Sequence, residues 1–211
     1  MDYLVKLLEL KKSENKKWFY HFFFLVIKQK KNMNKYLKNV IQLVLLLCFT
    51  FVIFHYIFLP VKISGDSMYP TLKDREMAIM DALHVKDDDI ERFDIIVIDS
   101  HYLEKYIVKR VIGLPGEKIE YKDDKLYIND QYYPESFLDQ DYINQIKADK
   151  GLSVFTDDFV IQLNDDELFV LGDNRINSLD SRVLGPVSYQ DVVAKNGMIW
   201  YPLNEMKWMD K

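Results

Sequence analysis

The sequence is poor in the residues that bind metals or form disulfides. It has one cysteine, Cys48, and four histidines among 211 residues. It contains no C-x-x-C, no H-E-x-x-H and no cluster of histidines, which are the patterns typical of zinc and thiol redox sites. A single cysteine cannot form a disulfide within the chain, so the part that follows it must be held together by its hydrophobic core. The sequence gives no reason to expect a metal or another cofactor.

Charge is absent from residues 40–60, which separate a basic segment from an acidic one. Residues 1–39 hold ten Lys against three Asp or Glu, and residues 61–211 hold 18 Lys or Arg against 30 Asp or Glu. At ~1.5 Å per residue, a helix over Val40–Leu59 would span ~30 Å, the thickness of a bilayer core. We therefore predict a transmembrane anchor over residues 40–60, ended by Pro60 because proline cannot donate a helical hydrogen bond.

A buried core helix and a cleaved signal sequence are the alternatives to this anchor. The apolar region of a signal sequence usually has ~7–15 residues and ends in a small-residue cleavage site, and no A-x-A follows Leu59. Lysines crowd the N-terminal flank, whereas Lys62 is the only basic residue close behind the run. The N-terminal flank is therefore expected in the cytoplasm and residues 61–211 outside it, in a single-pass protein of the cell membrane.

The N-terminal segment has a second methionine at which the chain might begin. Met33 opens the sequence MNKYLK directly before the apolar run, which would be a complete membrane start. In that interpretation residues 1–32 are an upstream extension of the basic segment. The lipid bilayer is then a partner of the chain, and the anchor together with the acidic balance of residues 61–211 argues against nucleic acid as a partner.

Short runs rich in β-branched and aromatic residues follow the anchor and predict a mainly β fold, an antiparallel sheet domain over residues 61–211. The expected strands are Glu76–Met80, Asp94–Asp99, Lys105–Leu114, Lys118–Tyr121, Leu126–Asn129, Phe159–Leu163, Glu167–Leu171 and Gly197–Tyr201. Apolar and polar residues alternate on both sides of Asp123 and Asp124, which predicts a hairpin turn there. Residues 134–157 break the alternation and are expected to be an insertion with one short helix before Gly151.

Ser67 lies in the first of three segments whose polar residues are unusual for a plain β domain. The segments are SGDSMYPTL (64–72), YIVKRVIGLPGE (106–117) and GDNRINSLDSR (172–182). A serine hydroxyl is a poor nucleophile unless a neighbouring base activates it and donors stabilise the oxyanion. Taken alone, Ser67 would be an ordinary serine in a polar turn.

Lys109 is the candidate base. Strand alternation places Lys109 and Arg110 on opposite faces of their strand, and both faces are otherwise apolar, so one of the two cations must be buried. Burial can lower the pKa of a lysine by up to ~3–5 units, which makes it a usable base, whereas arginine does not deprotonate. The alternative is a lysine at a strand edge whose amine reaches solvent. The four histidines, which have no patterned partner, are His21, His55, His84 and His101.

The segment 172–182 is dense in hydrogen-bonding side chains directly after an apolar strand. Such a composition predicts a loop whose side chains bond to backbone and to each other, with Asp180 and Arg182 as an ion pair and Asp173 as a further supporting residue. An ordinary polar turn is the alternative.

With all three motifs behind an apolar anchor, the chain resembles the type I signal peptidases, the membrane-anchored serine proteases that remove signal peptides from exported preproteins. The resemblance implies that Ser67 is the nucleophile, that Lys109 is its general base, and that the backbone N–H of Ser67 binds the oxyanion. It also implies that Ser178 orients the lysine while Asp180 and Arg182 support the loop.

The resemblance covers the chain from the anchor to the C-terminus and has one departure. Some members have a serine two positions before the nucleophile whose hydroxyl helps to bind the oxyanion, and here that position is Gly65, as in the shorter Gram-positive members. Two other functions fit parts of the pattern. A self-cleaving repressor protease would need a DNA-binding module, and a non-catalytic, membrane-tethered assembly or chaperone protein on the same fold would lack the serine or the lysine.

Overall fold

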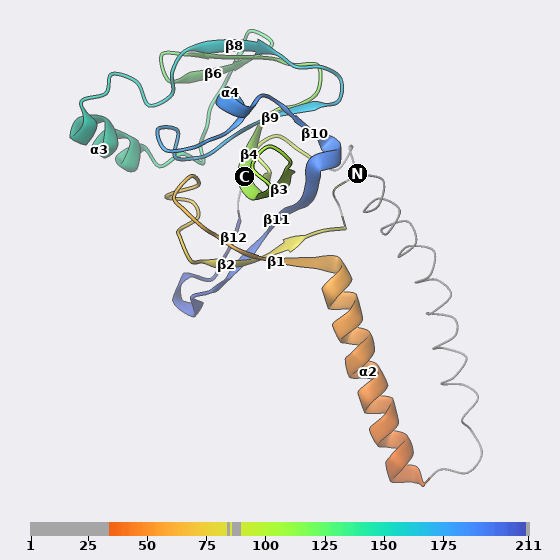
Figure 1. The fold of residues 1–211 in the computed structure, drawn as a ribbon. Coiled ribbons are helices and arrows are strands. Elements are labelled where there is room, and N and C mark those ends of the chain that lie inside the picture. The colour runs from red at the N-terminus through yellow and green to blue at the C-terminus, as the bar shows by residue number, and fades with distance from the viewer. Residues whose placement is uncertain (1–33, 84, 86–89, 210–211) are drawn as a thin grey trace. The chain divides into compact units, whose positions relative to one another are not determined.

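The computed structural model describes residues 34–83, 85 and 90–209 (Figure 1). The possible extension 1–32 and most of the predicted basic segment lie outside these described residues. By internal packing the chain divides into two units, residues 1–52 and residues 53–211. The second unit begins before the predicted boundary at residue 61, because the last turn of the apolar helix and the strand after it pack with the sheet domain.

Helix α2 (Lys35–Ile57) contains most of the predicted anchor. Its stretch Lys35–Val52 is long and apolar enough to cross a membrane, and Phe51 is 70% exposed. The predicted end of the helix is wrong by two residues, since Phe58–Lys62 forms strand β1 at the edge of a sheet. An edge strand tolerates proline, so Pro60 lies inside β1 instead of ending the helix.

Residues 53–211 form two antiparallel sheets, as a mainly β fold requires. The larger sheet has the order β1-β2-β11-β3-β4-β9-β10, with β12 paired to β11, and the smaller sheet has the order β7-β6-β5-β8. The strands of the larger sheet after β1 are β2 (Met77–Asp81), β3 (Ile95–Ser100), β4 (Lys105–Gly113), β9 (Glu167–Leu171), β10 (Val187–Ser188), β11 (Val192–Tyr201) and β12 (Lys207–Trp208). The strands of the smaller sheet are β5 (Lys118–Lys122), β6 (Lys125–Ile128), β7 (Gln131–Tyr133) and β8 (Phe159–Gln162).

All eight expected strands are present, so the mainly β prediction is confirmed, and four strands were missed. The missed strands β7, β10 and β12 have two or three residues each, too few to show an alternation. Strand β1 has five residues and was missed because its first residues continue the apolar run assigned to the anchor. Strand β11 also begins at Val192, five residues before the predicted start. Asn196 and Gly197 have positive φ angles and the pairing with β2 shifts there, so the strand continues through a bulge that the sequence pattern reads as a break.

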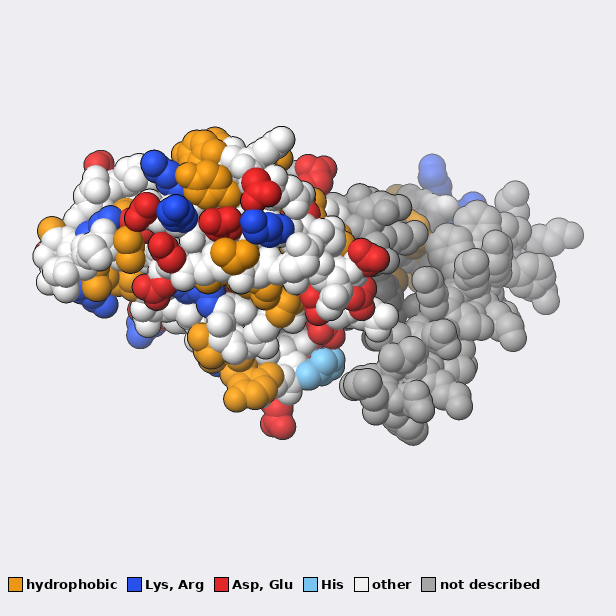
Figure 2. Space-filling model, turned by 90° about the horizontal axis from the view of Figure 1, so that it is seen from above, with side chains coloured by type: hydrophobic (Ala, Val, Ile, Leu, Met, Phe, Trp, Pro, Cys, Tyr) orange, Lys and Arg blue, Asp and Glu red, His pale blue; other side chains and the backbone are white. Residues whose placement is uncertain are grey.

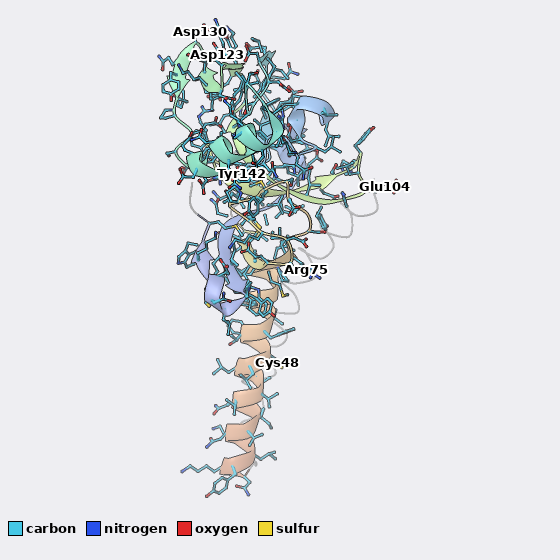
Figure 3. All side chains as sticks on the ribbon, turned by 90° about the vertical axis from the view of Figure 1, so that its left-hand side faces the viewer. Cys48, Arg75, Glu104, Asp123, Asp130 and Tyr142 are labelled. Carbon is cyan, nitrogen blue, oxygen red and sulfur yellow. The ribbon has the colours of Figure 1, made fainter. Side chains whose placement is uncertain are left out.

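The predicted hairpin and insertion helix are both confirmed. Asp123 and Asp124 join β5 to β6 with φ angles of 49° and 61°, the left-handed pair that a two-residue hairpin turn favours. Helix α3 (Gln140–Lys150) begins after Asp139, whose side chain accepts the Tyr142 N–H, and ends at Gly151 with φ 65°. Figure 3 labels Asp123 at the far end of the smaller sheet and Tyr142 on α3.

The described residues of the domain also form three short helices: α4 (Ser181–Leu184), η2 (Tyr189–Asp191) and η3 (Leu203–Glu205). Its surface mixes charge types, and the face in Figure 2 shows acidic and basic side chains interspersed with hydrophobic ones. Strand β3 is buried from Ile95 to Ile98 and separates two hydrophobic clusters, with Ile95 and Val97 in one and Ile96 and Ile98 in the other. Strand β4 pairs with β3 on one side and β9 on the other, so its middle residues are buried from both sides.

Candidate active site

The turn that carries Ser67 is fixed by hydrogen bonds from two directions. Gly65 has a φ of 84°, a conformation that favours glycine, and its N–H donates to Asp74 Oδ1 at 2.9 Å. From the segment 172–182, the Asn174 backbone N–H donates to the Ser67 carbonyl and the Asn174 Nδ2 donates to the Asp66 carbonyl, both at 3.0 Å. The backbone of the nucleophile turn is therefore held against this loop, which lies far from it in sequence.

The Lys109 amine lies against the Ser67 hydroxyl. Lys109 Nζ donates to Ser67 Oγ at 2.8 Å, and Lys109 is 3% exposed in the middle of β4. Burial lowers the pKa of Lys109 to about 8, against a partial opposing effect of the nearby Asp180 and Asp173 carboxylates. A serine hydroxyl and a lysine that loses its proton near neutral pH are thus within hydrogen-bond distance of each other.

Arg110, the neighbour of Lys109, is also buried, so both cations of the pair are removed from solvent. Its Nε and NH2 bond to the two carboxylate oxygens of Asp173 at 2.9 and 2.8 Å, and its guanidinium lies 4.0 Å from the centre of the Phe137 ring. Asp173 also accepts the Thr71 hydroxyl at 2.5 Å. Asp173 therefore links β4 to the segment that follows the nucleophile turn.

The predicted ion pair between Asp180 and Arg182 is present at 2.9 Å. Asp180 also accepts the Gly172 N–H at 3.0 Å and caps helix α4. Burial alone would raise the pKa of Asp180, but the Arg182 guanidinium and the Gly172 N–H lower it below its ordinary value. Asp180 is consequently an anion that contacts both ends of the segment 172–182, through the Gly172 N–H and the Arg182 guanidinium.

Ser178 lies close to the nucleophile but is not bonded to the lysine. The Cα of Gly172 packs so tightly against Ser178 Oγ and the Ser67 carbonyl oxygen that a β-carbon there would overlap both. Ser178 Oγ contributes to lowering the pKa of Asp180, yet it makes no hydrogen bond of normal geometry with any described residue. Its implied role in orienting Lys109 stays a prediction.

A buried cluster around Arg175 connects the loop to the smaller sheet, and sequence reasoning missed it. Arg175 Nε donates to the Gly172 carbonyl at 3.0 Å, NH1 to the Tyr121 hydroxyl at 2.8 Å and NH2 to Glu135 Oε1 at 2.5 Å. Burial raises the pKa of Tyr121 well above its ordinary value. Thr156 also contacts Arg175, so the insertion supplies two of its partners. Arg175 lies within the motif 172–182, but no local pattern identified its distant partners.

The rival bases do not reach Ser67 in the part of the chain that is described. His101 is exposed and lies 3.1 Å from Asp191, and the other three histidines or their side chains lie outside the described residues. No group of three metal-binding side chains occurs among residues 34–83, 85 and 90–209. The Ser67 backbone N–H takes part in none of the hydrogen bonds found within these ranges, so it is available as an oxyanion donor.

The sequence matches one protein-family model and is similar to several named bacterial proteins. Residues 33–201 match the family model described as signal peptidase, peptidase S26. The chain is 38% identical to signal peptidase I U of Bacillus subtilis (strain 168) over 80% of this chain and 89% of that protein. It is 37% identical to signal peptidase I S of the same organism over 86% of this chain and 96% of that protein.

More distant relatives and a solved structure carry the same name. Signal peptidase IB of Staphylococcus aureus (strain MRSA252) is 32% identical over 82% of this chain and 93% of that protein. A crystal structure of a signal peptidase I from Enterococcus faecalis V583 is 37% identical and covers 50% of this chain and 94% of that chain, with a TM-score of 0.43. On the match to the family model and on these sequence relatives, the chain belongs to the signal peptidase family, the S26 serine peptidases.

Proposed function

We propose that Ser67 and Lys109 form the catalytic dyad with which this signal peptidase cleaves signal peptides from exported preproteins. The supporting observation is the 2.8 Å contact between Lys109 Nζ and Ser67 Oγ, made by a lysine whose pKa burial lowers to about 8. A base with a pKa near the working pH transfers protons efficiently in both directions. The arrangement is a two-residue version of the serine, base and oxyanion-donor site.

In the first half of the reaction, neutral Lys109 takes the proton of Ser67 while Oγ attacks the carbonyl carbon of the scissile bond. The resulting oxyanion accepts the Ser67 backbone N–H, which the described residues leave unoccupied. The C–N bond then breaks, and the protonated Lys109 gives its proton to the leaving amine of the mature chain. An ester between Ser67 and the last residue of the signal peptide remains.

In the second half, water replaces the amine. Lys109, neutral again, takes a proton from the water as its oxygen attacks the ester carbon, and returns the proton to Ser67 Oγ as the C–O bond breaks. The products are the free carboxylate end of the signal peptide and the original enzyme. Asp173, Asp180 and Arg182 take no proton in this scheme; they hold the loop that fixes the Ser67 turn.

The chain acts at a membrane surface in this proposal. Helix α2 would be the single anchor, with its basic N-terminal flank in the cytoplasm and residues 58–211 outside the cytosol. Large apolar and aromatic side chains are also half or more exposed around η3 and β12, a composition typical of surfaces that contact lipid. These side chains are Tyr201, Leu203, Met206 and Trp208.

The test is N-terminal sequencing of the product after a preprotein is incubated with the detergent-solubilised enzyme. Wild type is expected to cut once, after an A-x-A sequence, whereas Ser67→Ala and Lys109→Met leave the preprotein intact. Lys109→Met keeps the side-chain length and removes the amine. An uncut preprotein with wild type would favour the non-catalytic alternative, and normal cleavage by Lys109→Met would show that another group is the base.

A further inference from the structure

A groove beside Ser67 runs along helix α3, and the mechanism above does not use it. It has a volume of about 480 Å³, within the ~300–1,000 Å³ typical of ligand pockets. One wall is the nucleophile turn with Asp66 and Tyr69, and the floor includes Asn174 and Ile176 of the loop 172–182. Asp66 directly precedes Ser67, so one wall of the groove belongs to the turn that carries the proposed nucleophile.

The other wall is one face of α3. Tyr142, Ile146 and Lys150 line the groove and are spaced four residues apart, so they form a stripe along the helix. From Tyr142 to Lys150 the stripe is ~12 Å long, because a helix rises ~1.5 Å per residue. An extended peptide of about four residues has that length. Tyr142 also packs edge-on against Tyr69 with 5.1 Å between ring centres, which ties α3 to the nucleophile turn.

We propose that this groove binds the first residues of the mature chain, on the C-terminal side of the scissile bond. The inference rests on the proposed peptidase function and assigns α3 and the 134–157 insertion a part in substrate recognition. The side chains before the scissile bond of a signal peptide are small, and selecting them needs pockets that exclude larger groups. A groove of about 480 Å³ with two tyrosines would not exclude them, and therefore it suits the mature side, which carries no such size restriction.

The chemistry of the lining agrees with a soluble, extended peptide as the occupant. Tyr69, Tyr142, Ile146 and Ile176 supply apolar area. Asn174 is 5% exposed, and its Nδ2 donates to the Asp66 carbonyl at 3.0 Å, so this part of the groove is fixed to the nucleophile turn. Figure 3 labels Tyr142 on α3, below the smaller sheet in that view.

The two ends of the groove carry opposite charges. Asp66 is beside the nucleophile, whereas Lys150 lies at the C-terminal end of α3, ~12 Å from Tyr142 along the helix. An acidic side chain about four residues into the mature chain would therefore face the Lys150 ammonium, and a basic one would be repelled. The residue type at that position becomes a determinant of cleavage rate.

The experiment compares two substrates with the same signal peptide: the full preprotein, and a peptide amide that ends at the first mature residue. The measured quantity is the ratio of their kcat/KM values. Tyr142→Ala is expected to lower this ratio about tenfold, because it removes aromatic contact area from the longer substrate alone. The control is Tyr102→Ala, a tyrosine that is 82% exposed and outside the groove, which should leave the ratio unchanged.

A second variant changes Lys150, an exposed residue in the last turn of α3, so the substitution leaves the packing of the helix intact. In preproteins with Asp or Lys at the fourth mature position, wild type should cut the Asp form faster, and the exposed Lys150→Glu should reverse that order. An unchanged ratio with Tyr142→Ala, or the same charge preference in wild type and Lys150→Glu, would overturn the proposal. If wild type cleaves neither the preprotein nor the short amide, the peptidase proposal itself fails.

Discussion

Lowering the pH should slow cleavage in proportion to the protonation of Lys109, because only its neutral amine can take the proton of Ser67. The pKa of Lys109 is lowered to about 8 by burial. A pKa of about 8 means that ~10% of the enzyme carries the neutral amine at pH 7 and ~90% at pH 9. Below pH 8, kcat/KM should therefore fall about tenfold for each pH unit.

The size of this effect follows from how far burial moves the lysine from its ordinary value. A solvent-exposed lysine with a pKa of 10.5 would be neutral in only about one molecule in 3,000 at pH 7. The buried position thus raises the neutral fraction at pH 7 roughly 300-fold. Lys105, an exposed cation of the same strand, contributes to the lowered pKa of Lys109, so Lys105→Gln should move the acid limb to higher pH.

The assay is the initial rate of preprotein cleavage by detergent-solubilised enzyme between pH 6 and 9.5, at constant ionic strength so that screening does not vary. Lys122→Gln removes an exposed charge from the smaller sheet and serves as the control, with an unshifted profile. A kcat/KM that stays constant from pH 6.5 to 9 would refute the reasoning. A limb near pH 6.5 in wild type would point to a histidine base.

Three further changes test the energetics of the site. Lys109→Met should raise Tm at pH 7 by roughly 5–10 °C. The pKa of Lys109 in the folded state, about 8, lies below the ordinary 10.5, so burying the protonated amine lowers the free energy of unfolding by about 3 kcal/mol below pH 8. This loss of stability disappears as the pH rises from about 8 to 10.5. The prediction fails if the gain in Tm is the same at pH 7 and pH 10.5. Gly172→Ala places a methyl group against the Ser67 carbonyl oxygen and should reduce kcat/KM about 100-fold, as measured with the preprotein assay. Glu135→Gln leaves the buried Arg175 without its counter-charge and should destabilise the fold by about 3–5 kcal/mol, seen as a lower midpoint of thermal unfolding.

The contact between Ser67 and Lys109, the proposed dyad, could be expected from the sequence because each residue stands in a local pattern. Ser67 lies in a glycine- and proline-bounded turn, and Lys109 interrupts an apolar strand where a charge is costly. Eight strands could be predicted for the same reason, since a run of four or more β-branched, aromatic or alternating residues is visible in the sequence alone. What the pattern around Lys109 could not show is that Arg110 is buried as well, because its burial depends on Asp173, 63 residues further along the chain.

The remaining parts of the site depend on contacts between distant segments. Three partners of Arg175 come from β5 and from the insertion, namely Tyr121, Glu135 and Thr156, and none of these three lies in a motif. The groove along α3 could not be predicted from the sequence either. The helix itself was predicted from its spacing, but its neighbour Tyr69 belongs to the nucleophile turn. Helix α2 ends early for a similar reason, because pairing of β1 with β2 overrides the apolar run.

The Arg175 cluster has a consequence for the time at which the protein becomes active. The turn with Ser67 emerges early during synthesis, but the loop that holds its carbonyl needs Arg175, and Arg175 in turn needs Tyr121 and Glu135 from the smaller sheet. In the proposed mechanism, a newly made chain would carry Ser67 as an ordinary, unreactive serine until both sheets have folded. Under this proposal, protease activity would begin only with the completed domain, and a partly folded copy would not cleave other chains.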